Sequence, residues 1–212
     1  MIQIQRFTFN PFQENTYVLY DDQQNCIVVD PGCYEVHEQE ALQKFVDQHG
    51  QNSVQLVNTH CHLDHIAGNK FIVDTYKVEL GIPEGEMSIL KAAPEHGKMY
   101  GFIIELSPEP NYFIEAGSKL TLGVNELAII SCPGHSPDHM VFYAKEEKQL
   151  IGGDVLFQLS IGRTDLPGGD HNALITNIKE KLWPLPDDVT VHPGHGPTTT
   201  IGFEKANNPF LV

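Results

Sequence analysis

The chain has 212 residues, 41% of them hydrophobic, so it is long enough to bury a real core, and its length fits one domain better than two. Thirteen Lys and Arg residues against 28 Asp and Glu residues give a formal net charge of −15. This charge repels phosphate backbones and anionic lipid surfaces, so we expect neither a nucleic acid nor a membrane as partner. The N-terminus has no basic region followed by an apolar run, and no apolar stretch is long enough to span a bilayer. We therefore expect a cytoplasmic protein whose residues 1–212 form a single domain.

The first half of the chain begins with predicted strands. Short apolar runs predict strands at residues 2–9, 15–20, 26–30 and 54–58. Apolar residues at helical spacing predict a helix at 35–49, and a shorter helix is expected at 66–76. Residues 81–117 are the least regular part, with a helix interrupted by Pro94 and then a loop, and they are the candidate substrate-facing segment.

The second half repeats this organisation. Strands are predicted near residues 119–123, 126–131, 140–144, 149–154 and 189–194. A helix is predicted from about Asp170 to Leu182, with Asp170 as its N-cap and Leu174, Ile178 and Leu182 on its inner face. Two blocks of strands, each followed by helical segments, indicate an α/β protein with two sheets packed together and helices outside.

The segment NTHCHLDHIAGN, residues 58–69, places three histidines and one aspartate within six positions, directly after a predicted strand. In an extended backbone residues i and i+2 project to the same side, so His60 and His62 can bind one metal ion. Asp64 and His65, just beyond them, could face a second ion. Two metals about 3.5–4 Å apart are typical of hydrolytic sites.

Three further residues have matching settings. His135, Asp154 and His195 each follow a predicted strand and lie beside a glycine, which lets the backbone approach a metal centre closely. An isolated histidine is more often a hydrogen-bonded structural residue, and we give that interpretation to the remaining six: His37, His49, His96, His139, His171 and His192.

The motif HCHLDH, followed by a later His, Asp and His in order, resembles the metallo-β-lactamase fold superfamily, as do DPG at residues 30–32 and PGH at 133–135. This resemblance implies a four-layer αββα sandwich with two mixed sheets and helices outside. It also implies a ligand set for two divalent metal ions. His60, His62 and His135 would hold one ion, Asp64, His65 and His195 would hold the other, and Asp154 would bridge them.

Residues 160–188 and 192–211 are similar to the short, single-domain branch of glyoxalase II-like (hydroxyacylglutathione hydrolase-like) hydrolases. The resemblance implies a metal-dependent hydrolase that cleaves a thioester such as a hydroxyacyl-glutathione. Two ions, zinc first and iron or manganese as alternatives, would lower the pKa of a bridging water to about 7 for attack on the acyl carbonyl. Asp64 and Asp154 would be the catalytic carboxylates. Longer relatives bind glutathione through an added helical domain, so the thiol part of the substrate stays open.

Other residues near the motifs have less specific interpretations. Arg163 is a candidate for binding a substrate carboxylate, although it could equally fasten its own loop through Asp165. Asp138 stands where relatives usually have glycine, and we interpret it as a loop change. Cys132 is expected to be a buried free thiol rather than a ligand, and all four cysteines are expected to be reduced.

Two other functions remain open. The same fold supports iron persulfide dioxygenases, which hold one metal through two histidines and one aspartate. From another class, the chain could be a non-catalytic metal-binding module. The partner expected for the hydrolase is a small-molecule thioester, and the oligomeric state is left open.

Overall fold

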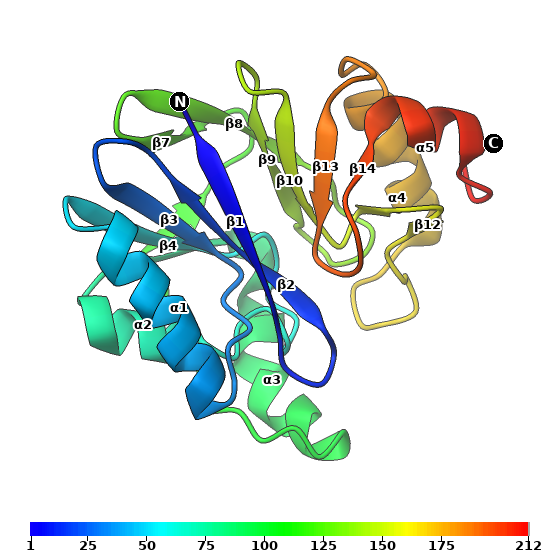
Figure 1. Cartoon of the computed structure of the whole chain (residues 1–212). Helices are drawn as coiled ribbons and strands as arrows, with labels where there is room; N and C mark the ends of the chain where they lie inside the picture. Colours follow the sequence, from blue (N-terminus) through cyan, green and yellow to red (C-terminus); the bar gives the residue numbers. More distant parts are fainter. Residues whose placement is uncertain (212) are drawn as a thin grey trace. The chain divides into compact units, whose positions relative to one another are not determined.

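The computed structural model describes residues 1–211, and the chain divides into two compact units (Figure 1). The first unit comprises Met1–Ile114 and Thr121–Asn125, and the second comprises Glu115–Leu120 and the residues from Glu126 onward. That the chain is one domain stays a prediction. Within residues 1–211 no helix has both the length and the apolar character needed to cross a membrane.

The first unit is built on a six-stranded mixed sheet whose strands lie in chain order. The strands are β1 (Gln3–Phe9), β2 (Glu14–Tyr20), β3 (Asn25–Val29), β4 (Ser53–Val57), β5 (Leu80–Pro83) and β6 (Tyr112–Ile114). β1, β2 and β3 pair antiparallel, whereas β3 to β6 pair parallel. The segments that follow β3, β4 and β5 therefore leave the sheet at the same edge, where α/β proteins commonly place their sites.

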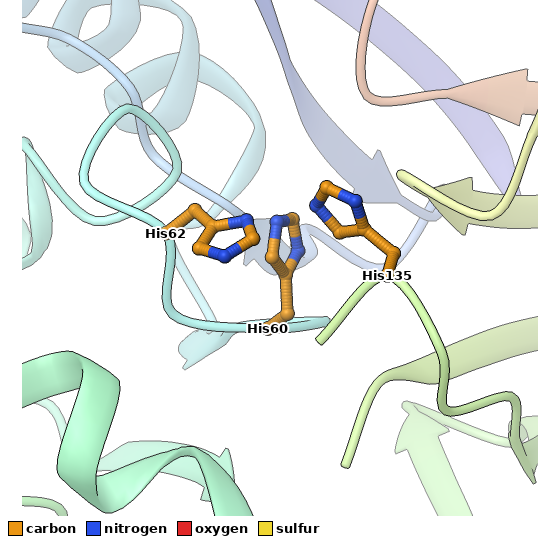
Figure 2. A group of neighbouring side chains, drawn as sticks. All are labelled: His60, His62 and His135. Carbon is orange, nitrogen blue, oxygen red and sulfur yellow. The ribbon is translucent and has the colours of Figure 1, made fainter. Parts of the chain in front are cut away.

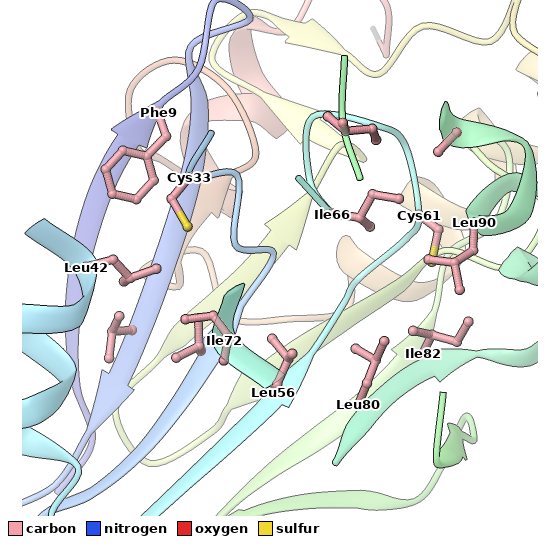
Figure 3. Close-up of a cluster of buried hydrophobic side chains, with 14 of the residues drawn as sticks. Phe9, Cys33, Leu42, Leu56, Cys61, Ile66, Ile72, Leu80, Ile82 and Leu90 are labelled. Carbon is pink, nitrogen blue, oxygen red and sulfur yellow. The ribbon is translucent and has the colours of Figure 1, made fainter. Parts of the chain in front are cut away.

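Four helical segments accompany this sheet: α1 (Val36–His49), α2 (Asn69–Tyr76), the 3₁₀ turn η1 (Glu84–Glu86) and α3 (Met87–Met99). Figure 1 shows α1 and α2 beside β3 and β4. α1 begins after Glu35, which forms a capping box with Glu38, and its Leu42 and Val46 are fully buried. Figure 3 shows the resulting core, in which each fully buried Leu or Ile side chain contributes about 1.5–3 kcal/mol.

The prediction that Pro94 interrupts its helix is wrong, because α3 runs through it. Proline removes one backbone hydrogen bond and is unfavourable inside a helix. Here the buried face continues on both sides of Pro94, with Leu90 and Ala93 before it and Gly97 after it. Burial of this face outweighs the lost hydrogen bond.

The second sheet is also six-stranded and mixed, in the order β14-β13-β10-β9-β8-β7. Its strands are β7 (Lys119–Leu122), β8 (Asn125–Ser131), β9 (Met140–Ala144), β10 (Gln149–Gly153), β13 (Thr190–Pro193) and β14 (Thr199–Thr200). β10 and β13 pair parallel, while β8, β9 and β10 pair antiparallel. β11 (Leu156–Phe157) and β12 (Ser160–Ile161) form a separate small hairpin.

The helices of the second unit are α4 (His171–Asn177), the π-helical turn η2 (Ile178–Leu182) and α5 (Ile201–Asn207). Asp170 caps α4 by accepting a hydrogen bond from the N–H of Ala173 at 3.0 Å, as predicted. The predicted inner face is confirmed, since Leu174, Ile178 and Leu182 are fully buried. Two mixed sheets with helices confirm the predicted α/β class.

Candidate metal centre

The loop between β4 and α2 carries four of the seven predicted ligands. The ring centroids of His60 and His62 lie 4.8 Å apart, and Figure 2 shows both rings on the same side of their loop, as their i and i+2 spacing predicts. The ring of His65 lies 4.2 Å from that of His60. Asp64 places its Oδ2 atom 3.8 Å from Nε2 of His65. The first unit thus gathers three imidazoles and one carboxylate in one loop.

Asp30, directly after β3, fixes the orientation of two of these imidazoles. Its Oδ2 atom accepts a hydrogen bond from Oγ1 of Thr59 at 2.6 Å and lies 3.2 Å from Nδ1 of His65. Because the Thr59 hydroxyl has given its only hydrogen to Asp30, its oxygen accepts from Nδ1 of His60, 3.0 Å away. Both histidines therefore carry hydrogen on Nδ1 and keep the lone pair of Nε2, the form that binds a metal ion.

Glu14, the first residue of β2, is fully buried behind His65. Its Oε1 atom lies 3.8 Å from Nδ1 of His65, and its Oε2 atom accepts a hydrogen bond from Oγ1 of Thr16. Burial raises the pKa of Glu14 well above its ordinary value, against a lowering by His65, and the charge of Asp30 raises it further. Burial and the nearby charge of Asp30 thus favour the neutral form of Glu14.

The backbone of the ligand loop is held by buried amide side chains. Nδ2 of Asn10, in the turn between β1 and β2, donates to the carbonyl of Asp64 at 3.0 Å. Nδ2 of Asn58 donates to the carbonyl of His65 at 3.2 Å, and Asn58 also exchanges hydrogen bonds with Asn69. Loops with this many buried hydrogen bonds have well-defined conformations, so the ligands are held in place before any ion binds.

The second unit supplies the other three predicted ligands. His135 lies in the turn between β8 and β9, Asp154 follows β10 directly, and His195 follows β13. Oδ2 of Asp154 lies 3.5 Å from Nε2 of His135 and 3.5 Å from Nε2 of His195. One carboxylate oxygen therefore lies close to two imidazole nitrogens.

The tautomer of His135 can be assigned from its contact with Arg163. Nδ1 of His135 lies 2.8 Å from the carbonyl oxygen of Arg163, and a carbonyl only accepts, so Nδ1 carries the hydrogen. Nε2 then presents a lone pair toward the carboxylate of Asp154. Two electron-rich atoms at this distance suit a cation bound by both, and the donor chemistry of these residues thus fits a divalent metal.

Two contacts at Asp154 involve residues outside the predicted set. Nε2 of His139, which is fully buried, accepts a hydrogen bond from the backbone N–H of Asp154 at 3.0 Å. A Cβ atom on Gly162 would lie only 1.9 Å from the carbonyl oxygen of Asp154, so the close approach of these two segments requires glycine. His139 is structural, as predicted, but the backbone that it holds belongs to a predicted ligand.

The side chain of Arg163 forms a bidentate salt bridge with Asp165, in which Nε and Nη2 of Arg163 donate hydrogen bonds of 2.7 and 2.8 Å. Both side chains are exposed. This is the geometry expected of a residue that fastens its own loop. Its role in binding substrate stays a prediction.

The four cysteines are all free and fully buried. Burial raises the pKa of Cys132 to about 12, which fits the expectation of a buried thiol. Asp138, also singled out in the sequence, is partly exposed beside the turn that carries His135.

The family model for the metallo-beta-lactamase superfamily matches residues 9–195. The hydroxyacylglutathione hydrolase GloC of Haemophilus influenzae is 38% identical over 202 residues, which cover 94% of this chain and 93% of that protein.

Two solved structures are similar over nearly their whole length. The BLEG-1 B3 metallo-beta-lactamase has a TM-score of 0.90 and 35% identity, covering 99% of this chain and 100% of that one. TTHA1623, solved in a di-iron-bound form, has a TM-score of 0.88 and 34% identity, covering 98% of this chain and 100% of that one. The chain therefore belongs to the metallo-beta-lactamase superfamily and is a metallo-hydrolase with the fold of that superfamily.

Proposed function

We propose that this protein hydrolyses a thioester, such as a hydroxyacyl-glutathione, with the help of two divalent metal ions. His60, His62 and His135 would hold one ion and Asp64, His65 and His195 would hold the other, with Asp154 as a ligand common to both sets. The ligand chemistry of each unit supports this proposal. The thioester substrate is supported by one observation, the 38% identity to a relative named as a hydroxyacylglutathione hydrolase.

Bound divalent ions would supply a water of lowered pKa and would stabilise negative charge on the acyl oxygen. Asp64 is the less buried carboxylate of the set and would orient the attacking water through its oxygens. Asp30 and the carbonyl of Arg163 keep the imidazoles of His65 and His135 in their metal-binding tautomers. A thiolate needs less protonation than an amine on leaving, so a thioester demands less of such a site than a β-lactam does.

The ligands are nitrogen and oxygen donors, which suit zinc, iron and manganese comparably. We propose zinc as the first metal to test. Iron is the second metal to test, because TTHA1623 was solved in a di-iron-bound form. The substrate would be a small molecule, and the net charge of −15 supports the absence of a nucleic acid or membrane partner.

The test uses metal-free protein reloaded with zinc, iron or manganese. Each form is assayed with a hydroxyacyl-glutathione, a thioester without glutathione and a chromogenic cephalosporin. We expect the metal-loaded protein to hydrolyse at least one thioester and to contain two metal ions per chain. His60→Ala and Asp154→Asn should each lose both the hydrolysis and the bound metal. His37→Ala is the matched control, because His37 is exposed on α1 and should not affect either measurement.

Two results would reject the proposal. One metal ion per chain, with oxygen consumed in the presence of a persulfide, would identify a dioxygenase. Metal-loaded protein that cleaves no thioester in a broad panel, with His60→Ala losing only stability, would identify a non-catalytic metal-binding module.

A further inference from the structure

Glu86 is a fully buried carboxylate at the end of η1, immediately before α3. Its Oε2 atom accepts a hydrogen bond from the backbone N–H of Cys61 at 3.0 Å. Cys61 is the residue between His60 and His62, so this acceptor holds the peptide segment that joins two proposed ligands. No sequence motif indicates this contact, because the two residues are 25 positions apart.

The parallel pairing of β4 and β5 brings the two segments together. Val57, the last residue of β4, pairs with Gly81 in β5, and the N–H of Asn58 still bonds to the carbonyl of Gly81. Beyond the ends of β4 and β5, both segments of the chain leave the sheet at the same edge. The ligand loop follows β4, and η1 with Glu86 follows β5.

The side chain of Cys61 provides a second point of attachment. It is fully buried in the hydrophobic core of the first unit, where Figure 3 shows it beside Leu90. With the amide held by Glu86 and the side chain held by the core, Cys61 can neither rotate nor shift easily. Neighbouring residues of an extended segment project to the opposite side, so this attachment fixes the direction of His60 and His62.

The cost of burying Glu86 indicates that its contact matters. A carboxylate taken out of water is strongly unfavourable unless donors satisfy its oxygens. Glu86 is the N-cap residue of α3, where the helix dipole favours negative charge, but its side chain makes no capping hydrogen bond. An apolar residue would fill the same space more cheaply, but it would leave the N–H of Cys61 without this acceptor.

We propose that Glu86 is a positioning residue that sets the directions of the His60 and His62 imidazoles through the backbone of Cys61. It would act through the backbone of Cys61 rather than as a metal ligand itself. This inference rests on the proposed function, since that function makes His60 and His62 metal ligands.

The test compares Glu86→Leu, which removes the acceptor, with Glu86→Gln, which keeps an amide oxygen in its place. We expect Glu86→Leu to bind zinc about 10–100-fold more weakly, in the range seen when support of a metal ligand is lost. At saturating zinc its kcat should fall while KM stays within twofold. Glu86→Gln should restore zinc affinity to within threefold of the wild type.

Glu204 offers a matched control in the second unit. It is also fully buried, and its Oε2 atom accepts the backbone N–H of Leu159 at 3.0 Å. Glu204→Leu should lower the unfolding temperature without weakening zinc binding. If Glu86→Leu behaves in the same way, the role of Glu86 is only structural and the inference fails.

A measurement on metal-free wild-type protein keeps the inference testable even if Glu86→Leu does not fold. The Cys61 amide should exchange its hydrogen far more slowly than exposed loop amides, and Glu86→Gln should preserve that protection. Fast exchange at Cys61 in the wild type overturns the inference, as does a Glu86→Gln variant that loses both protection and zinc affinity. If no thioester is cleaved, the proposed function fails, while zinc affinity and exchange still decide the role of Glu86.

Discussion

Oδ2 of Asp30 lies 3.2 Å from Nδ1 of His65, and both side chains are buried. The same carboxylate accepts the N–H and the hydroxyl of Thr59, so three donors converge on it. A group with one acceptor oxygen and one amide donor cannot satisfy all three. The variant Asp30→Asn therefore tests directly whether this carboxylate orients His65 and Thr59.

We expect Asp30→Asn to weaken metal binding about 10–100-fold. The new NH2 group would point at a hydrogen-bond donor, so either the imidazole of His65 would rotate or Thr59 would be displaced. The free energy of unfolding should fall by about 1–3 kcal/mol, the cost of a buried donor without its acceptor. Metal affinity is measured by competition with a chelator and stability by chemical denaturation.

Asp21→Asn is the control for this change. Asp21 is also buried and accepts from the N–H groups of Gln23 and Asn25 in the turn between β2 and β3. It should lose stability but not metal affinity. Wild-type metal affinity in Asp30→Asn would contradict the role given to Asp30.

The candidate ligands were predictable from sequence, because four lie within six positions and the others follow strands beside glycine. The residues that hold these ligands were not predictable. Asp30 reaches Thr59 across 29 positions, and Asn10 reaches Asp64 across 54. Such contacts depend on strand pairing and on the turn between β1 and β2, which no local pattern specifies.

The fold was predictable where apolar periodicity extends over several residues. α1 and the strands β2 and β3 lie within about one residue of their predicted ranges. β11, β12 and β14 have two residues each, too few for a pattern to emerge. At Pro94 local propensity gave the wrong answer, because burial of α3 depends on residues distant in sequence.

The pKa of Asp165 should depend on Arg163. The hydrogen bonds from the guanidinium are the largest cause that lowers this pKa, to about 2. A lowered pKa in the folded state adds stability above the unfolded value of about 3.9, and this contribution is lost as pH falls through about 2. We expect Arg163→Ala to raise the pKa of Asp165 toward about 3.9, as followed by NMR titration of the carboxyl carbon. An unchanged pKa would contradict the pairing.

The same variant tests substrate binding. Since the guanidinium is engaged by Asp165, we expect Arg163→Ala to change KM by less than threefold for both anionic and neutral thioesters. The backbone carbonyl that orients His135 is kept in this variant. A tenfold rise in KM confined to anionic thioesters would instead establish Arg163 as the residue that binds a substrate carboxylate.

The four cysteines should not react in the folded protein at pH 8. Burial raises the pKa of Cys26 and Cys132 to about 12, and it also raises the pKa of Cys33 and Cys61. The reactive thiolate is therefore scarce at this pH, and the side chains are out of reach of solvent. Mass spectrometry after alkylation should find no adducts on folded protein and four on denatured protein. Rapid labelling of Cys61 would show that its attachment to the core is not stable.

Gly162→Ala should disturb the two predicted ligands Asp154 and His135, because its new Cβ atom would collide with the backbone of Asp154. The added Cβ would lie 1.9 Å from the carbonyl oxygen of Asp154 and 3.1 Å from Nδ1 of His135. Because the closest contact is with a backbone atom, no side-chain rotation can relieve it, and the backbone at Asp154 or at residue 162 must shift. We expect a loss of about 1–3 kcal/mol in the free energy of unfolding, typical of overpacking, and a lower metal content after dialysis. Gly152→Ala is the milder control, since its Cβ would meet a side-chain atom of Val191 at 3.2 Å. The contrary result is a Gly162→Ala variant that keeps the metal content of the wild type and loses no more stability than Gly152→Ala does. That result would mean that the position of Asp154 does not govern metal binding.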